Sequence, residues 1–210
     1  MILLPVKHGR NFLRDKIAWI RRKILLECCL PTGTVCNAAI PVIYRFGSES
    51  DVNRLTLTAH DYDEEAKRFA IERLRSGDRL VLGEYLGDIV FYGWIMFGQM
   101  DLGYRSYRPI SKDTAYVYKL FTVKEHRGRR VLPGFYRFVA MQLEEIGIKR
   151  MLCWVNSTNV PSLKSHTRCG FLPIGSFYEI QLFGKTHYVL TRQARLSIGD
   201  QTQAIPRKRE

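Results

Sequence analysis

The sequence contains no long apolar segment. No stretch approaches the roughly 20 apolar residues that a membrane-spanning helix needs. The opening Met1-Ile2-Leu3-Leu4-Pro5 is too short to form the core of a secretory signal peptide. Internal repeats are also missing, which argues against solenoids and other repeat folds. We therefore expect a soluble protein of the cytoplasm.

Cysteine is sparse, and its spacing suits neither bridging nor metal binding. The five cysteines are an odd number and form no pair of C-x-x-C motifs. They are Cys28, Cys29, Cys36, Cys153 and Cys169. We therefore expect a reducing compartment, no disulfide framework and no metal site.

Basic residues outnumber acidic residues in this chain. The chain has 20 Asp and Glu against 33 Lys and Arg, which gives a formal net charge of +13 at pH 7. Such a charge attracts acidic partners, among them phosphate-bearing ligands, an acidic carrier protein, nucleic acid and an anionic membrane surface. Charge alone does not choose among these partners.

The length of the chain limits the number of domains. A chain of 210 residues with 46% hydrophobic content can bury one sizeable core but hardly two. We assign residues 39–192 to one folded domain and residues 1–38 to an N-terminal extension. Residues 193–210 are polar and charged with little periodicity, so we expect a flexible basic tail there.

The N-terminal extension carries a basic amphipathic pattern at residues 10–29. Apolar side chains recur mostly at steps of three and four residues, with basic side chains between them. The apolar set is Phe12, Leu13, Ile17, Ile20, Ile24 and Leu25, and the basic set is Arg14, Arg21, Arg22 and Lys23. The spacing predicts a helix. Such a helix either packs on the core of its own domain or docks on an anionic membrane or an acidic partner.

The rest of the domain alternates strands and helices. Periodicity and turn residues predict strands at 39–46, 79–85, 89–97, 114–123, 150–155, 176–183 and 186–191, and helices at 49–57, 61–76, 132–146 and 161–168. Between the strand at 114–123 and the helix at 132–146 lies the basic turn Lys-Glu-His-Arg-Gly-Arg-Arg, residues 124–130. A helix N-terminus directs N–H groups into such a turn, and phosphates are its natural ligands.

Two blocks of sequence resemble the GNAT (GCN5-related N-acetyltransferase) superfamily. The first runs from Leu120 to Leu132 and is similar to the family's strand followed by an R-G-x-G-x-G/A loop. The second comprises Asn159-Val160-Pro161-Ser162, Ser165-His166 and Gly170-Phe171, and it is similar to the family's N-x-x-[AS]…Y-x-x-x-G-F segment. Each block alone is weak, but their order and their separation by one strand are fairly specific. The resemblance covers residues 39–191.

The resemblance implies a fold, a donor and a binding site. The implied fold is α/β (α+β), a GNAT fold with a twisted, mixed, mostly antiparallel sheet of about six or seven strands flanked by helices. The implied co-substrate is acetyl-CoA, with no metal. In this family the strand before the loop contacts the pantetheine arm, and the loop amides hold the pyrophosphate. Carried over, the donor-binding residues are Phe121 and Val123 on the arm, Arg127, Gly128, Arg129, Arg130, Val131 and Leu132 at the phosphates, and Asn159 and Ser162 on the next helix.

Two residues of the loop depart from the family pattern. Arg130 and Leu132 stand where the family usually has glycine or another small residue. Glycine at such positions lets the backbone approach a phosphate closely. An arginine can still offer its N–H and add a charge-assisted bond from its side chain. Its bulk could equally obstruct CoA.

One residue is a candidate catalytic acid. His166 stands where many relatives have the tyrosine that protonates the departing thiolate, and a histidine could donate that proton. The alternative is an ordinary surface histidine. Asn159 and Ser162 have a similar alternative, because either could simply cap the helix at 161–168.

The general base and the acceptor site are less clear in the sequence. Asp113 stands at the start of the strand before the loop, where some relatives of the resembled family carry a glutamate base, and Glu84 and Glu125 are alternatives. None of the three is singled out as the base. The acceptor would contact residues 51–63 and the aromatic, basic connection at 98–111. The alternative for this connection is a solvated hairpin loop with a few packed tyrosines.

Three functions follow from these observations. The leading hypothesis is an acetyl-CoA-dependent N-acetyltransferase that acts on a small-molecule amine such as an amino sugar or sugar nucleotide. The second is an acyltransferase that uses a longer-chain or carrier-protein thioester, which the basic N-terminal segment and the crowded loop favour. The third is a non-catalytic GNAT-like binding module with a basic surface. We expect no specific nucleic-acid partner, and a homodimer is compatible with the sequence.

Overall fold

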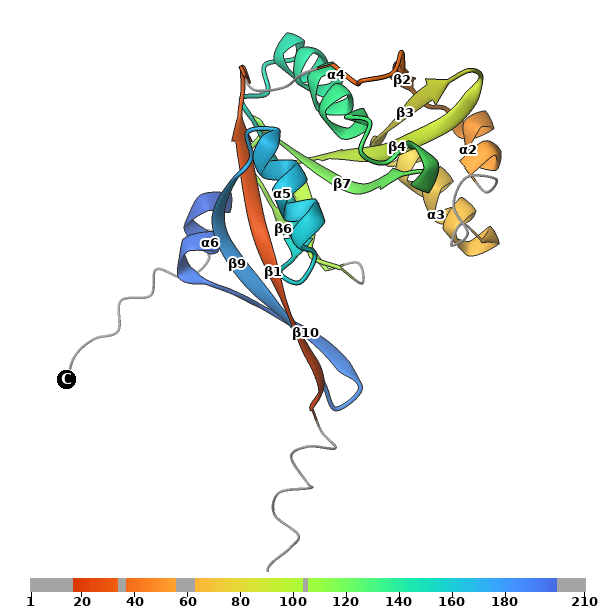
Figure 1. The fold of residues 1–210 in the computed structure, drawn as a ribbon. Coiled ribbons are helices and arrows are strands. Elements are labelled where there is room, and N and C mark those ends of the chain that lie inside the picture. The colour runs from red at the N-terminus through yellow and green to blue at the C-terminus, as the bar shows by residue number, and fades with distance from the viewer. Residues whose placement is uncertain (1–16, 34–36, 56–62, 104–105, 200–210) are drawn as a thin grey trace, which may run out of the picture.

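The computed structural model describes residues 17–33, 37–55, 63–103 and 106–199 (Figure 1). Ten strands are described: β1 (Ile17–Cys29), β2 (Ile43–Phe46), β3 (Arg79–Tyr85), β4 (Asp88–Phe97), β5 (Gln99–Asp101), β6 (Tyr107–Pro109), β7 (Thr114–Thr122), β8 (Arg150–Asn156), β9 (Leu172–Leu182) and β10 (Lys185–Leu190). The helices are α2 (Glu49–Leu55), α3 (Glu64–Arg75), the short 3-10 helix η1 (Lys124–His126), α4 (Val131–Glu145), α5 (Val160–Arg168) and α6 (Arg192–Ile198).

One large mixed sheet organises the domain. Its strand order is β10-β9-β1-β8-β7-β4-β3-β2, and β5 and β6 form a separate two-stranded ribbon. Every neighbouring pair in the large sheet is antiparallel except β7 with β8, which is parallel. The predicted α+β fold with a mostly antiparallel sheet is confirmed, with eight strands in place of six or seven.

Each face of the sheet is covered by helices and has its own apolar core. On one face α4 and α5 pack on β7, β8 and β1 through residues such as Phe135, Val139 and Phe171. On the other face α2, α3 and α6 contribute Leu55, Ala70 and Ile198 to a second core. Because side chains alternate along a strand, neighbours such as Leu25 and Leu26 enter opposite cores. None of the helices in the described part of the chain is long and apolar enough to cross a membrane.

The predicted N-terminal helix is wrong for residues 17–29. They form β1, which lies in the sheet between β8 and β9 and pairs antiparallel with both. Both faces of this strand are covered near its C-terminal end, where Leu25 and Leu26 are at most 2% exposed. A strand covered on both faces has a continuous apolar run instead of strict alternation, so the run Ile24-Leu25-Leu26 also suited a helix. Residues 10–16 lie outside the described residues.

In the structure the folded domain extends beyond both predicted ends. Because β1 is a central strand, the folded domain includes part of the segment assigned to an extension. At the other end, residues 192–198 form α6 instead of a flexible tail, and Ala194 and Ile198 are buried. Thr191 caps this helix by accepting a hydrogen bond from the Ala194 amide. Residues 200–210 lie outside the described residues.

The other predicted elements agree with the structure to within a few residues. Two differ more at their starts: β2 begins at Ile43 instead of residue 39, and β9 begins at Leu172 instead of residue 176. The connection predicted as a long loop at 98–111 contains the β5–β6 ribbon. Its residues 104 and 105 lie outside the described residues.

Candidate active site

Strands β7 and β8 separate soon after they pair. Their parallel register consists of three pairs, from Thr114 with Arg150 to Tyr116 with Leu152. Beyond Tyr116, β7 remains paired with β4 on its other side, with an irregularity in the register between Tyr92 and Trp94. Lys119 in this bulged part of β7 has a positive φ of 49°. The divergence leaves backbone groups of β7 facing a gap in the sheet.

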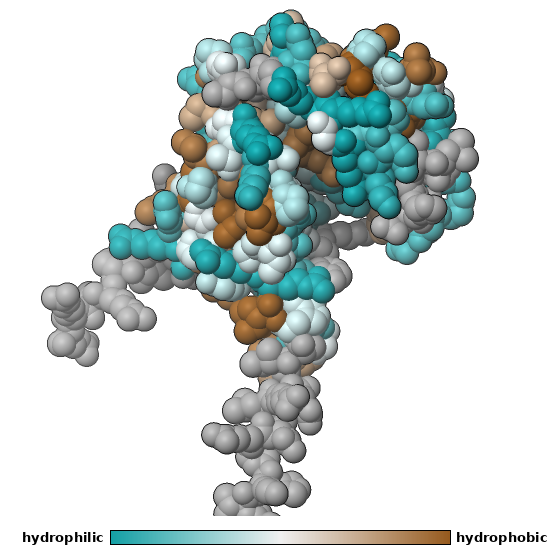
Figure 2. Space-filling view, viewed as in Figure 1, coloured by the Kyte–Doolittle hydropathy of each residue, from teal (hydrophilic) through white to brown (hydrophobic). Residues whose placement is uncertain are grey.

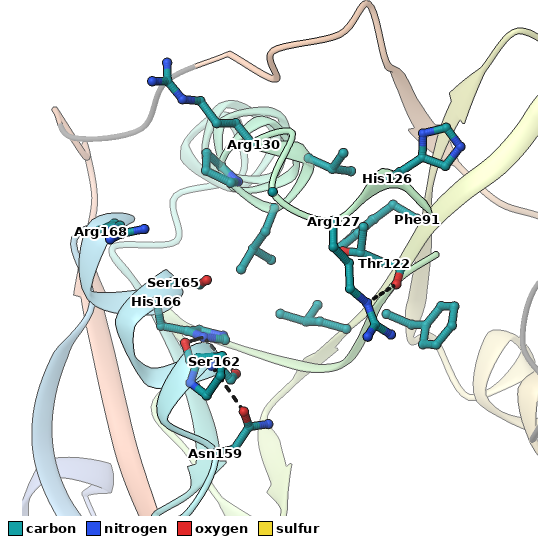
Figure 3. Close-up of a pocket in the computed structure, with 17 residues that line it drawn as sticks. Phe91, Thr122, His126, Arg127, Arg130, Asn159, Ser162, Ser165, His166 and Arg168 are labelled. Carbon is teal, nitrogen blue, oxygen red and sulfur yellow. Dashed lines mark hydrogen bonds between the residues drawn. The ribbon is translucent and has the colours of Figure 1, made fainter. Parts of the chain in front are cut away.

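A cavity of about 800 Å³ opens at this gap on the face that carries α4 and α5. Its walls come from the end of β7, the turn before α4, the first turn of α4 and one face of α5 (Figure 3). They are Phe91, Leu120, Phe121, Thr122, His126, Arg127, Gly128, Arg130, Val131, Leu132, Pro133, Asn159, Pro161, Ser162, Ser165, His166 and Arg168. On the face seen in Figure 2, apolar residues lie at the floor of a hollow and hydrophilic residues at its rim.

The N-terminus of α4 lies at this cavity without a side-chain cap. The N-cap residue is Arg130, and its side chain makes no capping hydrogen bond. The first N–H groups of a helix have no partner within the helix, so those of Val131 and Leu132 suit an anion. The helix has 15 residues, and its dipole adds to this preference.

The turn before α4 keeps the backbone geometry that glycine usually provides. Gly128 has a φ of 77°, and a side chain there would meet no atom within 4 Å. Arg130 also adopts the left-handed conformation, with a φ of 55°. A non-glycine residue pays about 1–2 kcal/mol for that conformation. Arg130 therefore follows the glycine path, and its guanidinium points away from the middle of the cavity (Figure 3).

Nine of the eleven predicted site residues line this cavity, and two do not. The nine are Phe121, Arg127, Gly128, Arg130, Val131, Leu132, Asn159, Ser162 and His166. Val123 is engaged elsewhere, because its N–H donates to the Val90 carbonyl at 3.0 Å. The Arg129 carbonyl accepts a hydrogen bond from the Ala39 amide at 2.8 Å. Neither residue is part of the cavity wall.

Arg127 is held against the end of β7. Its Nε donates to the Thr122 carbonyl at 3.1 Å, and its guanidinium lies 6.0 Å from the centre of the Phe121 ring. The side chain is exposed and extends over the mouth of the cavity (Figure 3). A cation in this place favours a phosphate-bearing ligand.

Helix α5 presents its first turn and His166 to the cavity. Asn159 caps the helix, because its Oδ1 accepts from the Ser162 amide at 3.2 Å. The capping alternative for Asn159 is therefore observed, and its amide NH₂ remains a possible donor to a ligand. His166 is only 4% exposed, so it is not an ordinary surface histidine.

The hydrogen bond of His166 determines which ring nitrogen can donate. Nδ1 lies 2.8 Å from the Ser162 carbonyl oxygen, which can only accept. In the neutral ring Nδ1 therefore carries the proton, and Nε2 is an acceptor. Burial lowers the pKa of His166 below its ordinary value of 6.5, with the Ser162 carbonyl acting in the opposite sense. The ring is therefore mainly neutral at pH 7.

The cavity also contains residues that sequence reasoning missed. Four of them are polar: Thr122, His126, Ser165 and Arg168. His126 adjoins the Arg-Gly turn, and Ser165 lies one helical turn after Pro161, so their spacing offered a signal. Arg168 offered none, since a basic residue at the end of a helix is commonplace.

None of the three carboxylates considered as bases lines this cavity. Asp113 accepts a hydrogen bond from the Ser111 hydroxyl, which is the main cause of its lowered pKa. Glu84 is ion-paired with Arg45 and Arg54, each at 2.8 Å. Glu125 is exposed. The described residues include no group of three or more His, Cys, Asp or Glu side chains arranged to hold a metal ion.

Part of the predicted acceptor region lines a second cavity on the opposite face of the sheet. Gln99, Asp101, Gly103 and Tyr107 of the 98–111 connection belong to its wall. Described residues of the other predicted segment, 51–55 and 63, do not line it. Residues 56–62 lie outside the described residues.

A family model matches most of the chain that builds these cavities. The model, described as "Acetyltransferase (GNAT) family", matches residues 47–171. This span contains the diverging strands, the α4 turn and α5. No curated protein matches the chain by sequence.

Solved structures show the same fold at low sequence identity. An acetyltransferase of the GNAT family from Colwellia psychrerythraea has a TM-score of 0.56 at 12% identity, covering 81% of this chain and 59% of its own. A GNAT-family structure from Novosphingobium aromaticivorans has a TM-score of 0.52 at 14% identity, with 78% and 64% coverage. A glucosamine N-acetyltransferase region of a fungal multi-domain GH3 β-N-acetylglucosaminidase has a TM-score of 0.59 at 14% identity, with 81% and 22% coverage. The chain thus spans less than two thirds of the length of each of these three proteins.

Proposed function

Because the chain belongs to the GNAT family of acetyltransferases, whose co-substrate is acetyl-CoA, we propose that it acetylates an amine of a small molecule, such as an amino sugar or a sugar nucleotide. One observation carries the proposal: the uncapped N-terminus of α4 and the diverging end of β7 border the same cavity. A phosphate group and an amide-bearing arm can therefore be bound side by side.

The residues fit an acyl-CoA donor. The amides of Val131 and Leu132 would hold the pyrophosphate, with Arg127 as a nearby cation. Phe121 and the open backbone of β7 would contact the pantetheine arm. Leu132 lines the cavity and also packs against the core cluster that includes Val131 and Phe135, so a cavity of about 800 Å³ remains beside it. Arg130 also leaves the cavity open, which weakens the case for a donor other than CoA.

The proposed reaction needs positioning more than activation, because a thioester is already reactive. The amine nitrogen attacks the thioester carbonyl carbon, and the C–S bond breaks. The departing thiolate receives a proton, and the amine nitrogen loses one. His166 is the proposed residue at the sulfur. Because Nε2 is unprotonated in the neutral ring, His166 can pass a proton to the sulfur only after it has taken one up, and the proton that the amine loses balances this step.

The test is amine-dependent release of CoA from acetyl-CoA. Purified protein is supplied with acetyl-CoA and, separately, with 2-phenylethylamine, D-glucosamine and UDP-glucosamine. Free thiol is measured, and the amine is analysed by mass spectrometry. We expect thiol release only with an amine, together with an N-acetylated product. Thiol release at the same rate without amine, or none with any amine, would contradict the proposal.

A further inference from the structure

The second cavity lies across β7 from the proposed donor site. It has a volume of about 1010 Å³, and its wall includes Tyr116, Tyr118 and Lys119 of β7 and Trp154 of β8. The next residues of β7, Leu120 and Phe121, line the first cavity. The parallel pairing of β7 with β8 ends at Tyr116, so the part of β7 that lines both cavities is not paired with β8. We call the second cavity the chamber.

The charge of the chamber differs from that of the chain. Its wall carries three carboxylates, Glu72, Asp78 and Asp101, and two cations, Arg73 and Lys119. The whole chain has a net charge of +13. A wall with more carboxylates than cations on such a protein favours a positively charged ligand and opposes a diphosphate.

Aromatic rings supply most of the remaining wall. They are Phe69, Phe97, Tyr107, Tyr116, Tyr118 and Trp154. Tyr116 and Tyr118 are stacked, with centroids 5.3 Å apart and planes 8° from parallel. Tyr116 Oη and Trp154 Nε1 both donate to the Asp101 carbonyl, at 2.9 and 2.8 Å. These hydrogen bonds hold the Tyr116 and Trp154 rings in place, and an aromatic wall suits an apolar body or an ammonium group.

Asp78 is the most buried carboxylate of this wall, at 9% exposure. Its Oδ2 accepts a hydrogen bond from Tyr118 Oη at 2.5 Å. Burial raises its pKa, and Tyr118 and the positive charge of Arg73 act in the opposite sense. The Arg73 guanidinium lies over the Tyr118 ring, 5.5 Å from its centre. A buried carboxylate is costly unless it is paired, and a cationic ligand would reduce that cost.

We propose that the chamber is the acceptor site and that it selects a cationic primary amine with an apolar or aromatic body, with Asp78 as the carboxylate that receives the ammonium group. The bound ammonium loses one proton before its nitrogen attacks the thioester and a second one as the amide forms. The proposal rests on the proposed function: it keeps the small-molecule amine and replaces the amino sugar and sugar nucleotide with an apolar amine. Amines of this class fit both the carboxylates and the rings. Sugar nucleotides, whose diphosphate would face the three carboxylates, do not.

The test measures binding of 2-phenylethylammonium to the full chain by calorimetry, with 2-phenylethanol as its neutral counterpart. In Asp78→Asn the side-chain oxygen can still accept from Tyr118, but the charge is lost. We expect this variant to bind the ammonium about tenfold more weakly or worse, and the alcohol unchanged. Asp88→Asn, which changes an exposed aspartate at the β3–β4 turn, should leave both affinities unchanged.

Three results would overturn the proposal. They are no binding of 2-phenylethylammonium by wild type, equal loss of amine and alcohol binding in Asp78→Asn, and tighter binding of UDP-glucosamine than of the simple amine. If Asp78→Asn fails to fold, Tyr118→Phe replaces it. This variant removes the hydrogen bond that favours the charged form of Asp78, so a preferential loss of ammonium over alcohol is again expected. Acetyl-CoA affinity is measured on the same samples. If wild type binds the amine but does not bind acetyl-CoA, the donor site is rejected and the assignment of the chamber as an amine site stands.

Discussion

Arg130 combines a backbone conformation that suits glycine with a side chain that suits phosphate. Its φ of 55° continues the turn that Gly128 begins. Sequence reasoning identified the position and its departure from the family pattern. It could not decide whether the bulk closes the site, because that depends on where the side chain points.

The conformation of Arg130 predicts a gain in stability on substitution. Arg130→Gly removes the left-handed strain and should raise the free energy of unfolding by about 1 kcal/mol relative to Arg130→Ala, which keeps the Cβ atom. Urea unfolding of the two variants measures this difference. Acetyl-CoA affinity should be equal in both, because both lack the guanidinium. Equal stabilities would show that the turn is not strained.

The burial of His166 predicts that the free energy of unfolding depends on pH. Its folded pKa is lowered from 6.5 by burial, so the unfolded chain binds this proton more readily than the folded chain. The contribution of His166 to the free energy of unfolding is therefore complete above the pKa of the unfolded chain. It is lost as the pH falls from that pKa through the lowered pKa of the folded chain. His166→Gln should lose less stability than wild type between about pH 7.5 and pH 5 in urea unfolding. An identical loss in both proteins would contradict the burial of a neutral ring.

At the scale of elements, the local signals predicted most of the fold and failed for β1. Helix α4, its turn and α5 were predictable because caps, breakers and periodicity act within a few residues. The pairing of β1 with β8 and β9 joins residues more than 100 positions apart, for example Leu26 with Cys153, and leaves no local signal. For the same reason only the 98–111 part of the chamber wall was predicted, since the rest of the wall comes from α3, β4, β7 and β8.

Because β1 is a central strand, loss of its buried ion pair should lower the free energy of unfolding. Lys23 Nζ lies 3.2 Å from Glu179 Oε2 on β9, and both side chains are at most 6% exposed. Lys23→Met would leave the carboxylate buried without this partner and should cost about 3 kcal/mol or more. Adding Glu179→Gln should restore part of the loss, as measured by denaturant unfolding. A surface helix would instead tolerate Lys23→Met with little change.

At the scale of the whole molecule, the sheet separates two cavities of different chemistry. The face with α4 and α5 offers uncapped amides and arginines, and the opposite face offers carboxylates and rings. Neighbouring residues of β7 line both cavities: Tyr118 and Lys119 face one, and Leu120 and Phe121 face the other. This arrangement suits a phosphate-bearing donor on one side and a cationic acceptor on the other. Net charge alone pointed to acidic partners in general and could not reveal that the two faces differ.

The most direct test of this account is calorimetric titration of acetyl-CoA into wild type, Gly128→Trp and Gly87→Trp. Both glycines have a positive φ, 77° and 91°, and open space around them, so the two substitutions carry similar backbone strain. Only Gly128 lies in the first cavity. The account predicts binding to wild type and Gly87→Trp and its loss in Gly128→Trp. Equal affinity in all three proteins, or no binding by wild type, would contradict it.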